Sequence, residues 1–186
     1  MKGELHMNIL ILNGSPHPNG TTAALRKAFE EEAVKAGHKV TTFHTAKEEL
    51  HACLGCDHCR NTDDGCVFKD SMEKLNPLLF EADCVVFVTP LYYFGMSAQI
   101  KLAIDRFYAN NSALREQKKK ALLIAACGDV DTDALDALDE HYHTLCRYLH
   151  WENIGELNAI GMYVREDLKN SNYIEEARKL GASLPK

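Results

Sequence analysis

The chain has 186 residues, of which 46% are hydrophobic and 26% are charged, and its formal net charge at pH 7 is −6. This balance is typical of one globular domain, and its apolar runs are too short to span a membrane. The negative charge disfavours nucleic acid and anionic membranes as partners, since both reward clustered Lys and Arg, and the basic run 118–120 is interpreted as a solvated turn.

The N-terminal sequence MKGELHMNIL lacks the apolar segment and small-residue cleavage site of a signal peptide, and Met7 is an alternative start. Because no signal peptide is recognised, we expect a cytoplasmic protein. Thiols stay reduced in that compartment. Seven cysteines in a reducing compartment indicate metal binding, redox chemistry or burial rather than a disulfide framework.

Strand-length apolar runs alternate with helix-length amphipathic segments along the chain. Strands are expected at 7–12, 39–43, 84–88, 121–127 and 154–163, and helices at 22–36, 71–81, 97–110, 133–150 and 172–180. This alternation predicts an α/β fold, in which a doubly wound parallel sheet carries helices on both faces. Five strands fit the flavodoxin-like order 2-1-3-4-5. We expect a single domain over 1–186 with an irregular loop at about 44–70.

The first strand leads into NGSPHPNGTT, residues 13–22, directly before a helix. Backbone N–H groups, hydroxyls and the helix dipole at such a position suit an anion, although a polar turn capped by a threonine is the alternative. A nucleoside triphosphate loop is excluded, because Gly14 and Gly20 are one residue too far apart and Thr21 stands where lysine is required. A phosphate monoester such as that of FMN fits better, with His17 as the only side chain in the loop that can add positive charge.

Two further strand ends carry candidate binding residues. The third strand is followed by three aromatic residues, Tyr92, Tyr93 and Phe94. Aromatic side chains here suit a flat isoalloxazine ring, and burial in the core or in a subunit interface is the alternative. At the end of the fourth strand, Cys127 and Gly128 could close the far side of the pocket, whereas Asp129 is interpreted as a helix cap.

The loop after the second strand contains HACLGCDHCRNTDDGC, with four thiols at Cys53, Cys56, Cys59 and Cys66. The spacing C-x2-C-x2-C is the compact form that iron–sulfur clusters use. Four thiolates also suit Zn²⁺, although structural zinc sites more often use two separated C-x2-C pairs. Free thiols near the flavin edge are the third reading, and the residues leave all three open. The other cysteines, Cys84, Cys127 and Cys146, are expected to be buried.

The stretches NGSPHPNGTT, CLGCDHC with Cys66 following, and TPLYYFGMSAQIKLAIDRF occur in this order over about residues 7–108. In these motifs the chain resembles the NADPH-dependent FMN reductase and flavodoxin-like family, and within it the iron–sulfur flavoproteins and related NAD(P)H-dependent oxidoreductases. The resemblance implies a flavodoxin-like fold, bound FMN and a homodimer or homotetramer.

The activity that the resemblance implies is that of an FMN-dependent NAD(P)H oxidoreductase. Electrons would pass from a pyridine nucleotide through the flavin to a quinone, a flavin, a nitro compound, an iron–sulfur centre or a redox protein. The alternative is a non-enzymatic electron carrier of the flavodoxin or iron–sulfur flavoprotein type. No catalytic side chain is expected in either case, because the flavin itself carries the chemistry.

The resemblance also assigns residues by position. The phosphate would be held by Ser15, His17, Asn19, Thr21 and Thr22. The ring would be lined by Pro90, Leu91, Tyr92, Tyr93, Phe94 and Gly95. The ligands of a 4Fe–4S cluster, where one is present, would be Cys53, Cys56, Cys59 and Cys66. Two departures stand out: His17 replaces a frequent Arg or Lys, and the glycine-rich third loop of the quinone-reductase relatives is reduced to Gly128, which weakens an inference of quinone specificity.

Overall fold

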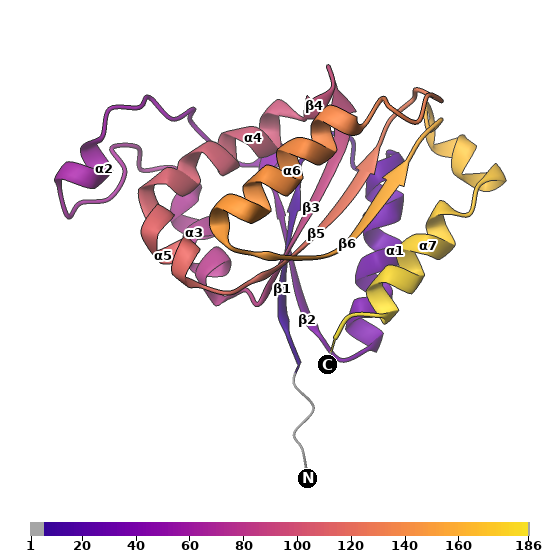
Figure 1. Cartoon of the computed structure of the whole chain (residues 1–186), viewed down its shortest axis with the longest axis horizontal. Coiled ribbons are helices and arrows are strands. Elements are labelled where there is room, and N and C mark those ends of the chain that lie inside the picture. The colour runs from indigo at the N-terminus through magenta and orange to yellow at the C-terminus, as the bar shows by residue number, and fades with distance from the viewer. Residues whose placement is uncertain (1–5, 186) are drawn as a thin grey trace, which may run out of the picture.

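Five parallel strands form the centre of the computed structural model, which describes residues 6–185 (Figure 1). They are β1 (Asn8–Asn13), β2 (Lys39–His44), β3 (Cys84–Tyr92), β5 (Lys120–Ala126) and β6 (Glu152–Ala159). Their order, β2-β1-β3-β5-β6, confirms the flavodoxin-like prediction. The numbering differs because β4 (Gly95–Met96) is a short strand that pairs antiparallel with the end of β3. The predictions for the N-terminal segment fall mainly on residues 1–5, outside the described residues.

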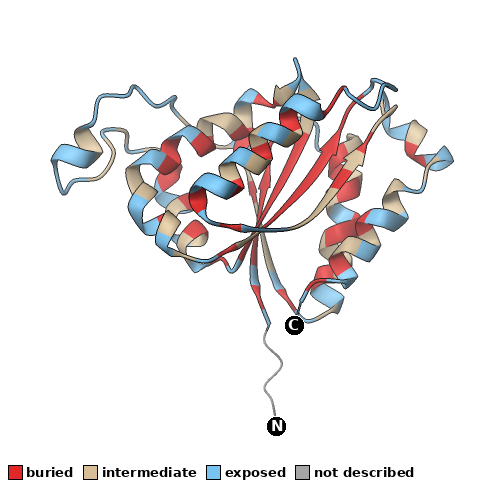
Figure 2. Ribbon diagram, viewed as in Figure 1, coloured by how far each residue is buried: buried red, intermediate tan, exposed pale blue. Residues whose placement is uncertain are grey.

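Helices cover both faces of this sheet. On one face lie α1 (Thr21–Lys35) and α7 (Tyr173–Ala182). The other face is covered by α3 (Met72–Glu81), α4 (Ala98–Asp105), α5 (Asn111–Glu116) and α6 (Asp136–Leu149). Successive strand residues point to opposite faces, so Leu10 and Leu12 join one apolar cluster while Ile9 and Ile11 join the other. The central strands are therefore buried on both sides, as Figure 2 shows.

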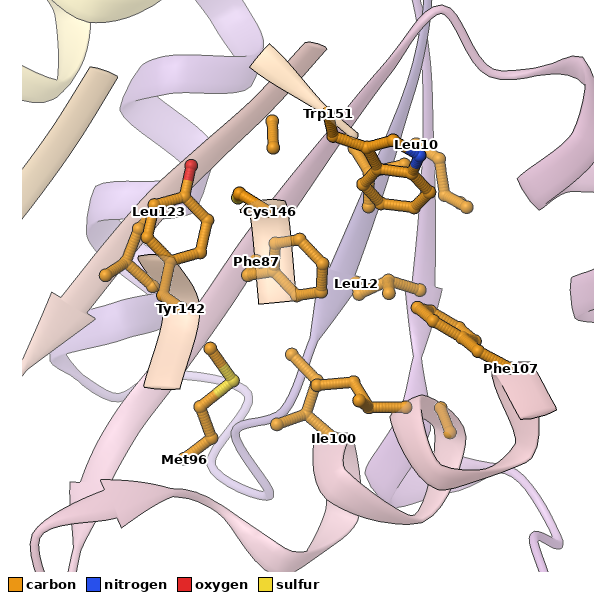
Figure 3. Close-up of a cluster of buried hydrophobic side chains, with 14 of the residues drawn as sticks. Leu10, Leu12, Phe87, Met96, Ile100, Phe107, Leu123, Tyr142, Cys146 and Trp151 are labelled. Atoms are coloured by element: carbon orange, nitrogen blue, oxygen red, sulfur yellow. The ribbon is translucent and has the colours of Figure 1, made fainter. Parts of the chain in front are cut away.

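The larger apolar cluster lies between the sheet and helices α3 to α6 (Figure 3). The rings of Phe87 and Tyr142 meet edge to face, with centroids 5.9 Å apart. The buried polar ends of the aromatic residues are hydrogen bonded: Tyr142 Oη donates to Asn153 Oδ1 at 3.0 Å, and Trp151 Nε1 donates to Leu114 O at 3.1 Å. This cluster thus holds α6 on the sheet without leaving those donors unpaired.

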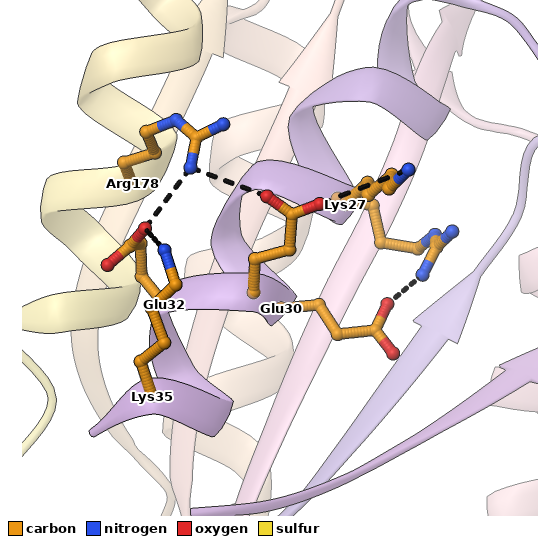
Figure 4. Close-up of polar contacts among 7 residues, drawn as sticks. Lys27, Glu30, Glu32, Lys35 and Arg178 are labelled. Atoms are coloured by element: carbon orange, nitrogen blue, oxygen red, sulfur yellow. Dashed lines mark hydrogen bonds and ion pairs between the residues drawn. The ribbon is translucent and has the colours of Figure 1, made fainter. Parts of the chain in front are cut away.

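On the opposite face, α1 and α7 approach closely. A Cβ atom at Gly181 would collide with the carbonyl oxygen of Phe29, so this approach requires glycine. Across the surface of the two helices, Arg178 Nη1 lies 3.4 Å from Glu31 Oε2 and 3.1 Å from Glu32 Oε1 (Figure 4). These two acidic residues of α1 therefore bridge it to α7, the C-terminal helix.

Several segments differ from the sequence predictions. The strand predicted at 84–88 continues through Pro90 to Tyr92. The helix expected at 97–110 continues as α4 only to Asp105, and then as the 3₁₀ helix η2 (Arg106–Asn110) where Arg106 enters a buried ion pair with Asp70. The last strand is Glu152–Ala159 rather than 154–163, because the chain turns at Gly161, whose φ is 69°. Lys119 is buried, so the interpretation of a solvated turn is wrong there.

The buried Lys119 has a structural role at the amino-terminal edge of the sheet. Its Nζ atom donates to the carbonyl oxygens of Phe80 and Ala82 at 3.2 Å and 2.5 Å. These carbonyls stand at the end of α3, so the ammonium group binds the helix C-terminus. Burial lowers the pKa of Lys119.

Within residues 6–185, no helix combines the length and apolarity that a bilayer crossing would require. Cys84, Cys127 and Cys146 are buried, as expected.

Candidate functional site

A cleft of about 1040 Å³ opens at the carboxyl ends of the strands, between the loops that follow β1, β3, β5 and β6. Strand ends are where open α/β sheets bind ligands, and the volume lies at the top of the usual range of about 300–1,000 Å³. The structure brings ten of the predicted flavin-site residues into its lining: Ser15, His17, Asn19, Thr21, Thr22, Pro90, Leu91, Tyr92, Cys127 and Gly128. It places three others outside this lining, namely Tyr93, Phe94 and Gly95.

The loop after β1 is fixed by hydrogen bonds to β3 and to Ser97, the N-cap of α4. Gly14 donates its N–H to Val88 O at 2.8 Å, and its own carbonyl accepts from Ser97 Oγ at 2.7 Å. Ser97 therefore uses its hydroxyl to bind this loop and not to cap α4. A Cβ atom at Gly14 would lie 2.6 Å from Ser97 Oγ, so glycine allows the loop to sit directly on α4.

The loop then delivers an open helix N-terminus to the cleft. Gly20 is the N-cap of α1, no described side chain caps the helix, and its first turn contains no acidic residue. The alternative of a threonine cap is therefore not what forms here. Instead, Thr21 and Thr22 line the cleft at the start of a 15-residue helix, whose first N–H groups have no acceptor within the helix. The hydroxyl of Ser15 accepts the N–H of His17 at 3.2 Å, and together these groups are a neutral donor set that could hold an anion.

The end of β3 forms the apolar wall of the cleft with Pro90, Leu91 and Tyr92. A two-residue turn then returns the chain to β4, and both turn residues have left-handed backbones, with φ of 47° at Tyr93 and 61° at Phe94. Tyr93 is fully exposed at 101% and Phe94 is 62% exposed. The aromatic run is therefore divided, with one ring on the cleft and two at a projecting hairpin tip.

The loops after β5 and β6 form the opposite wall and are joined to each other. Met162 donates its N–H to Cys127 O at 2.7 Å, and Gly161 donates to Asp129 O at 2.5 Å. A Cβ atom at Gly128 would lie 2.8 Å from the ring of Tyr163, so the loops pack without space for a side chain there. Burial raises the pKa of Cys127, and the negative charge of Asp129 raises it further, whereas backbone hydrogen bonds lower it. The pKa is raised overall, so the thiol at the cleft is neutral.

Several lining residues were missed by the sequence reading: Pro18, Gly20, Ala126, Asp129, Met162, Tyr163, Val164, Arg165 and Glu166. Five of them follow β6: Met162 and Tyr163 were assigned to the predicted strand 154–163, and Val164, Arg165 and Glu166 lie just beyond it. Gly161 was the available signal, because a glycine near the end of an apolar run marks a turn. Asp129 was interpreted as a helix cap, whereas its carbonyl ties two loops of the cleft together.

The cysteine loop extends away from the body of the domain and carries the short helix α2 (His58–Asn61) at its far end (Figure 1). Its base is fixed by Arg106 and Asp70, whose side chains are each 2% exposed and whose Nη1 and Oδ2 atoms lie 2.7 Å apart. Arg106 Nη1 also donates to His51 O at 3.0 Å, and the N–H groups of His51 and Met72 donate to Asp70. Burial alone would raise the pKa of Asp70, but these hydrogen bonds and the guanidinium charge outweigh it and lower the pKa to about 2.

The four thiols of this loop share one region but do not form a preformed metal cage. Cys53 and Cys56 are exposed, whereas Cys59 and Cys66 are half-buried. Burial raises the pKa of Cys59, and the nearby thiols of the other three raise it further. Among the described residues, no three His, Cys, Asp or Glu side chains converge as a metal would require. None of the four lines the cleft.

The donor set of the cleft fits a flavin mononucleotide. One end offers hydroxyls and free helix N–H groups for a phosphate dianion, and the side wall offers apolar and aromatic surface for a planar ring. These two features come from different strands, and the sheet sets their spacing.

Comparison with known proteins agrees with this chemistry. The sequence profile described as NADPH-dependent FMN reductase matches residues 7–163. The chain is 33% identical over 127 residues to an iron–sulfur flavoprotein of Methanocaldococcus jannaschii, covering 66% of this chain and 63% of that protein. It spans between 48% and 52% of the length of three further iron–sulfur flavoproteins.

Two solved structures show the same fold. The NAD(P)H:quinone oxidoreductase from Methanothermobacter marburgensis superimposes with a TM-score of 0.80 at 19% identity, covering 96% of both chains. An FMN-dependent NADH-azoreductase from Bacillus anthracis, solved in complex with FMN, superimposes with a TM-score of 0.68 at 14% identity and covers 94% of this chain and 98% of that one. At these identities the likeness establishes the architecture.

Proposed function

Because the chain belongs to the NADPH-dependent FMN reductase family, we propose that it is an FMN-dependent oxidoreductase that takes electrons from NADH or NADPH. The electrons go to a small-molecule acceptor such as a quinone, a flavin or a nitro compound, or to an iron–sulfur centre or redox protein. The observation that carries this proposal is the cleft, which combines an uncapped helix N-terminus with an apolar wall at the strand ends. One domain supplies all of these residues.

The chain's own residues would bind and orient the cofactor. Ser15, His17, Asn19, Thr21 and Thr22 hold the phosphate, where backbone N–H groups and hydroxyls replace its hydration. When bound, FMN supplies the electron transfer itself, accepting a hydride from the pyridine nucleotide and passing electrons to the acceptor.

The two walls of the cleft set access to the ring. Pro90, Leu91 and Tyr92 support one side, and the joined loops after β5 and β6 close the other around the neutral thiol of Cys127. Tyr93, Phe94 and Gly95 lie outside the lining of the single chain, so any contact of theirs with the ring involves movement of the hairpin tip or a second subunit.

Flavin content and turnover test this proposal together. The purified protein should bind FMN, and its flavin absorbance should bleach when NADH or NADPH is added without oxygen. Steady-state oxidation of the pyridine nucleotide with a quinone or nitro compound distinguishes an enzyme from an electron carrier, which would bind FMN but turn over very slowly. A protein that binds no FMN contradicts both.

We further propose that the cysteine loop assembles a 4Fe–4S cluster. The compact spacing of its thiols and the names of several relatives, which are iron–sulfur flavoproteins, support this proposal. The described thiols do not surround a common centre, so cluster binding would require the loop to close around the metal.

Anaerobic reconstitution tests the cluster. About four iron and four sulfide per chain are expected, and Cys59→Ser should lower both. Cys146→Ser, which changes a buried cysteine of α6, is the matched control and should keep its iron. Less than about one iron per chain, or zinc in its place, would rule the cluster out.

We propose a homodimer or homotetramer in the cytoplasm. Exposed apolar side chains near the mouth of the cleft and on the adjoining hairpin support self-association: Tyr92, Tyr93, Phe94, Val130, Tyr163 and Val164. All seven cysteines are free thiols, which supports a reducing compartment. Sedimentation equilibrium measures the oligomeric state directly, and a monomer at micromolar concentration would contradict the first part of this proposal.

A further inference from the structure

The cleft lining contains one residue with a permanent positive charge, Arg165, in a loop that sequence reading did not connect with binding. Among the described residues that line the cleft, the remaining side chains are neutral or acidic apart from His17. The β1 loop therefore presents a site for a dianion with little charge of its own. Arg165 follows β6 and is about 150 positions away in sequence, so only the fold brings it to this loop.

The geometry connects Arg165 to the phosphate end of the cleft. Its Nη1 atom lies 3.4 Å from the carbonyl oxygen of Asn19, in the loop that leads into α1. The segment that carries it is anchored: η3 (Arg165–Asn170) buries Leu168 in the same apolar cluster as Leu25 of α1. The guanidinium is thus positioned beside the open helix N-terminus by packing between η3 and α1.

Arg165 carries a charge that no carboxylate of residues 6–185 pairs with in the structure. Within residues 6–185 its side chain forms no ion pair with a carboxylate, although Glu166 and Asp167 follow it directly. The carboxylate of Asp167 accepts the N–H of Val164 at 2.8 Å and so caps its own segment. Four of the five guanidinium donors are left for another acceptor.

We propose that Arg165 is a phosphate-binding residue of the flavin site and supplies the charge that the β1 loop lacks. The ligand group is a phosphate monoester dianion, which a guanidinium binds through two parallel hydrogen bonds. This inference rests on the proposed function, because it takes FMN as the occupant of the cleft. The contact with Asn19 favours the FMN phosphate over that of the pyridine nucleotide, since the guanidinium lies against the loop at the start of α1.

The test compares FMN with riboflavin, which has the same ring and lacks the phosphate. Flavin fluorescence quenching by the apoprotein should show that Arg165→Met weakens FMN binding about 10-fold to 100-fold, as expected for a charged hydrogen bond. Riboflavin affinity should stay unchanged, and Arg165→Lys should restore part of the FMN affinity. The FMN dissociation constant of Arg165→Met should also depend less on salt.

Lys169→Met is the matched control, because Lys169 lies on the same 3₁₀ helix but outside the lining of the cleft, and it should bind both flavins as the wild type does. Equal weakening of FMN and riboflavin in Arg165→Met would overturn the inference, since it would indicate a role in folding or ring packing. Unchanged FMN affinity, or a raised KM for NADPH alone, would also overturn it. A wild-type protein that binds neither flavin would overturn the proposed function itself.

Discussion

At the scale of single residues, the cleft depends on glycines, which have no side chain to fill the space between packed segments or to cap a helix. Gly14 and Gly128 let a loop sit against Ser97 and Tyr163 respectively, and Gly20 leaves the N-terminus of α1 uncapped. A capping carboxylate at position 20 would satisfy the same N–H groups that a phosphate needs. Under the proposed function, the uncapped N-terminus of α1 lowers local helix stability and leaves these N–H groups for the phosphate.

The hairpin tip shows the opposite arrangement, with large side chains in a strained backbone. Tyr93 and Phe94 both have positive φ, a conformation that a two-residue hairpin turn requires and that asparagine or glycine adopts at less cost. Tyr93 contributes no burial to the single chain, because it is fully exposed. Tyr93 thus adds no apolar burial to the single chain, and Phe94 adds only a part of its surface.

We predict that Tyr93→Asn stabilises the monomeric fold. Relief of the left-handed backbone should raise the free energy of unfolding by about 0.5–1 kcal/mol, measured by urea denaturation. Tyr163→Asn makes the same replacement at a tyrosine that is 87% exposed and has no positive φ, and it should give no gain. A loss of stability in Tyr93→Asn that grows with protein concentration would instead place Tyr93 in a subunit interface.

At the scale of elements, the site depends on how helices and loops pack on the two faces of the sheet. α1 carries the anion site at its N-terminus and is held along its length by α7 and η3. The loops after β5 and β6 act as one wall because backbone hydrogen bonds join Cys127 and Asp129 to Met162 and Gly161. Displacing one helix or one loop would therefore change several binding groups together.

Gly181 is the position where this packing is tightest, and we predict that Gly181→Ala destabilises the protein. In an unconstrained helix the change would stabilise by about 1 kcal/mol, because alanine is the better helix former. Here the new methyl group meets the Phe29 carbonyl, and we expect a loss of about 1–3 kcal/mol in the free energy of unfolding. Lys179→Ala, at an exposed position of the same helix, is the control and should change stability little. A stabilised Gly181→Ala would show that α7 can shift away from α1 freely.

At the scale of the whole molecule, the flavin cleft and the cysteine loop are separate parts connected through α4 and η2. The pair Arg106–Asp70 fixes the base of the loop, while α2, which carries Cys59, lies farther out. Ser97, the N-cap of α4, binds the β1 loop, and α4 leads into Arg106, which binds the base of the cysteine loop. One continuous helical segment thus contacts the base of both.

The ion pair makes stability depend on pH. The pKa of Asp70 is about 2 in the folded protein against an ordinary 3.8, so the carboxylate stabilises the fold fully above about pH 4, and this contribution is lost as the pH falls towards 2. The lost contribution is about 2 kcal/mol. Removing the carboxylate at pH 7 leaves the buried Arg106 unpaired and should cost more, about 3 kcal/mol.

We therefore predict that Asp70→Asn lowers the free energy of unfolding at pH 7 and flattens its fall between pH 4 and 2. Urea denaturation across this pH range measures both effects. Asp63→Asn removes an exposed carboxylate from the same loop and should behave as the wild type. An equally steep acid transition in Asp70→Asn would assign the pH dependence to other carboxylates.

Sequence alone determined the alternation of strands and helices, the order of the sheet and the position of the glycine-rich loop between the first strand and the first helix. These features depend on local patterns: apolar runs of strand length, amphipathic helices, and a glycine- and hydroxyl-rich turn before a helix. For the same reason, ten of the thirteen residues proposed for the flavin lie together in the cleft, since strand ends at one edge of a parallel sheet are neighbours.

Tertiary structure alone decided the features that depend on distant partners. The burial of Lys119 and Arg106 follows from carbonyls and a carboxylate that lie more than 30 positions away, and no local pattern indicates them. The division of the aromatic run follows from a hairpin turn. Arg165 reaches the phosphate loop only because η3 packs against α1, at the opposite end of the sequence. The charge of Arg165 therefore lies at the cleft because of tertiary packing, which no local sequence pattern indicates.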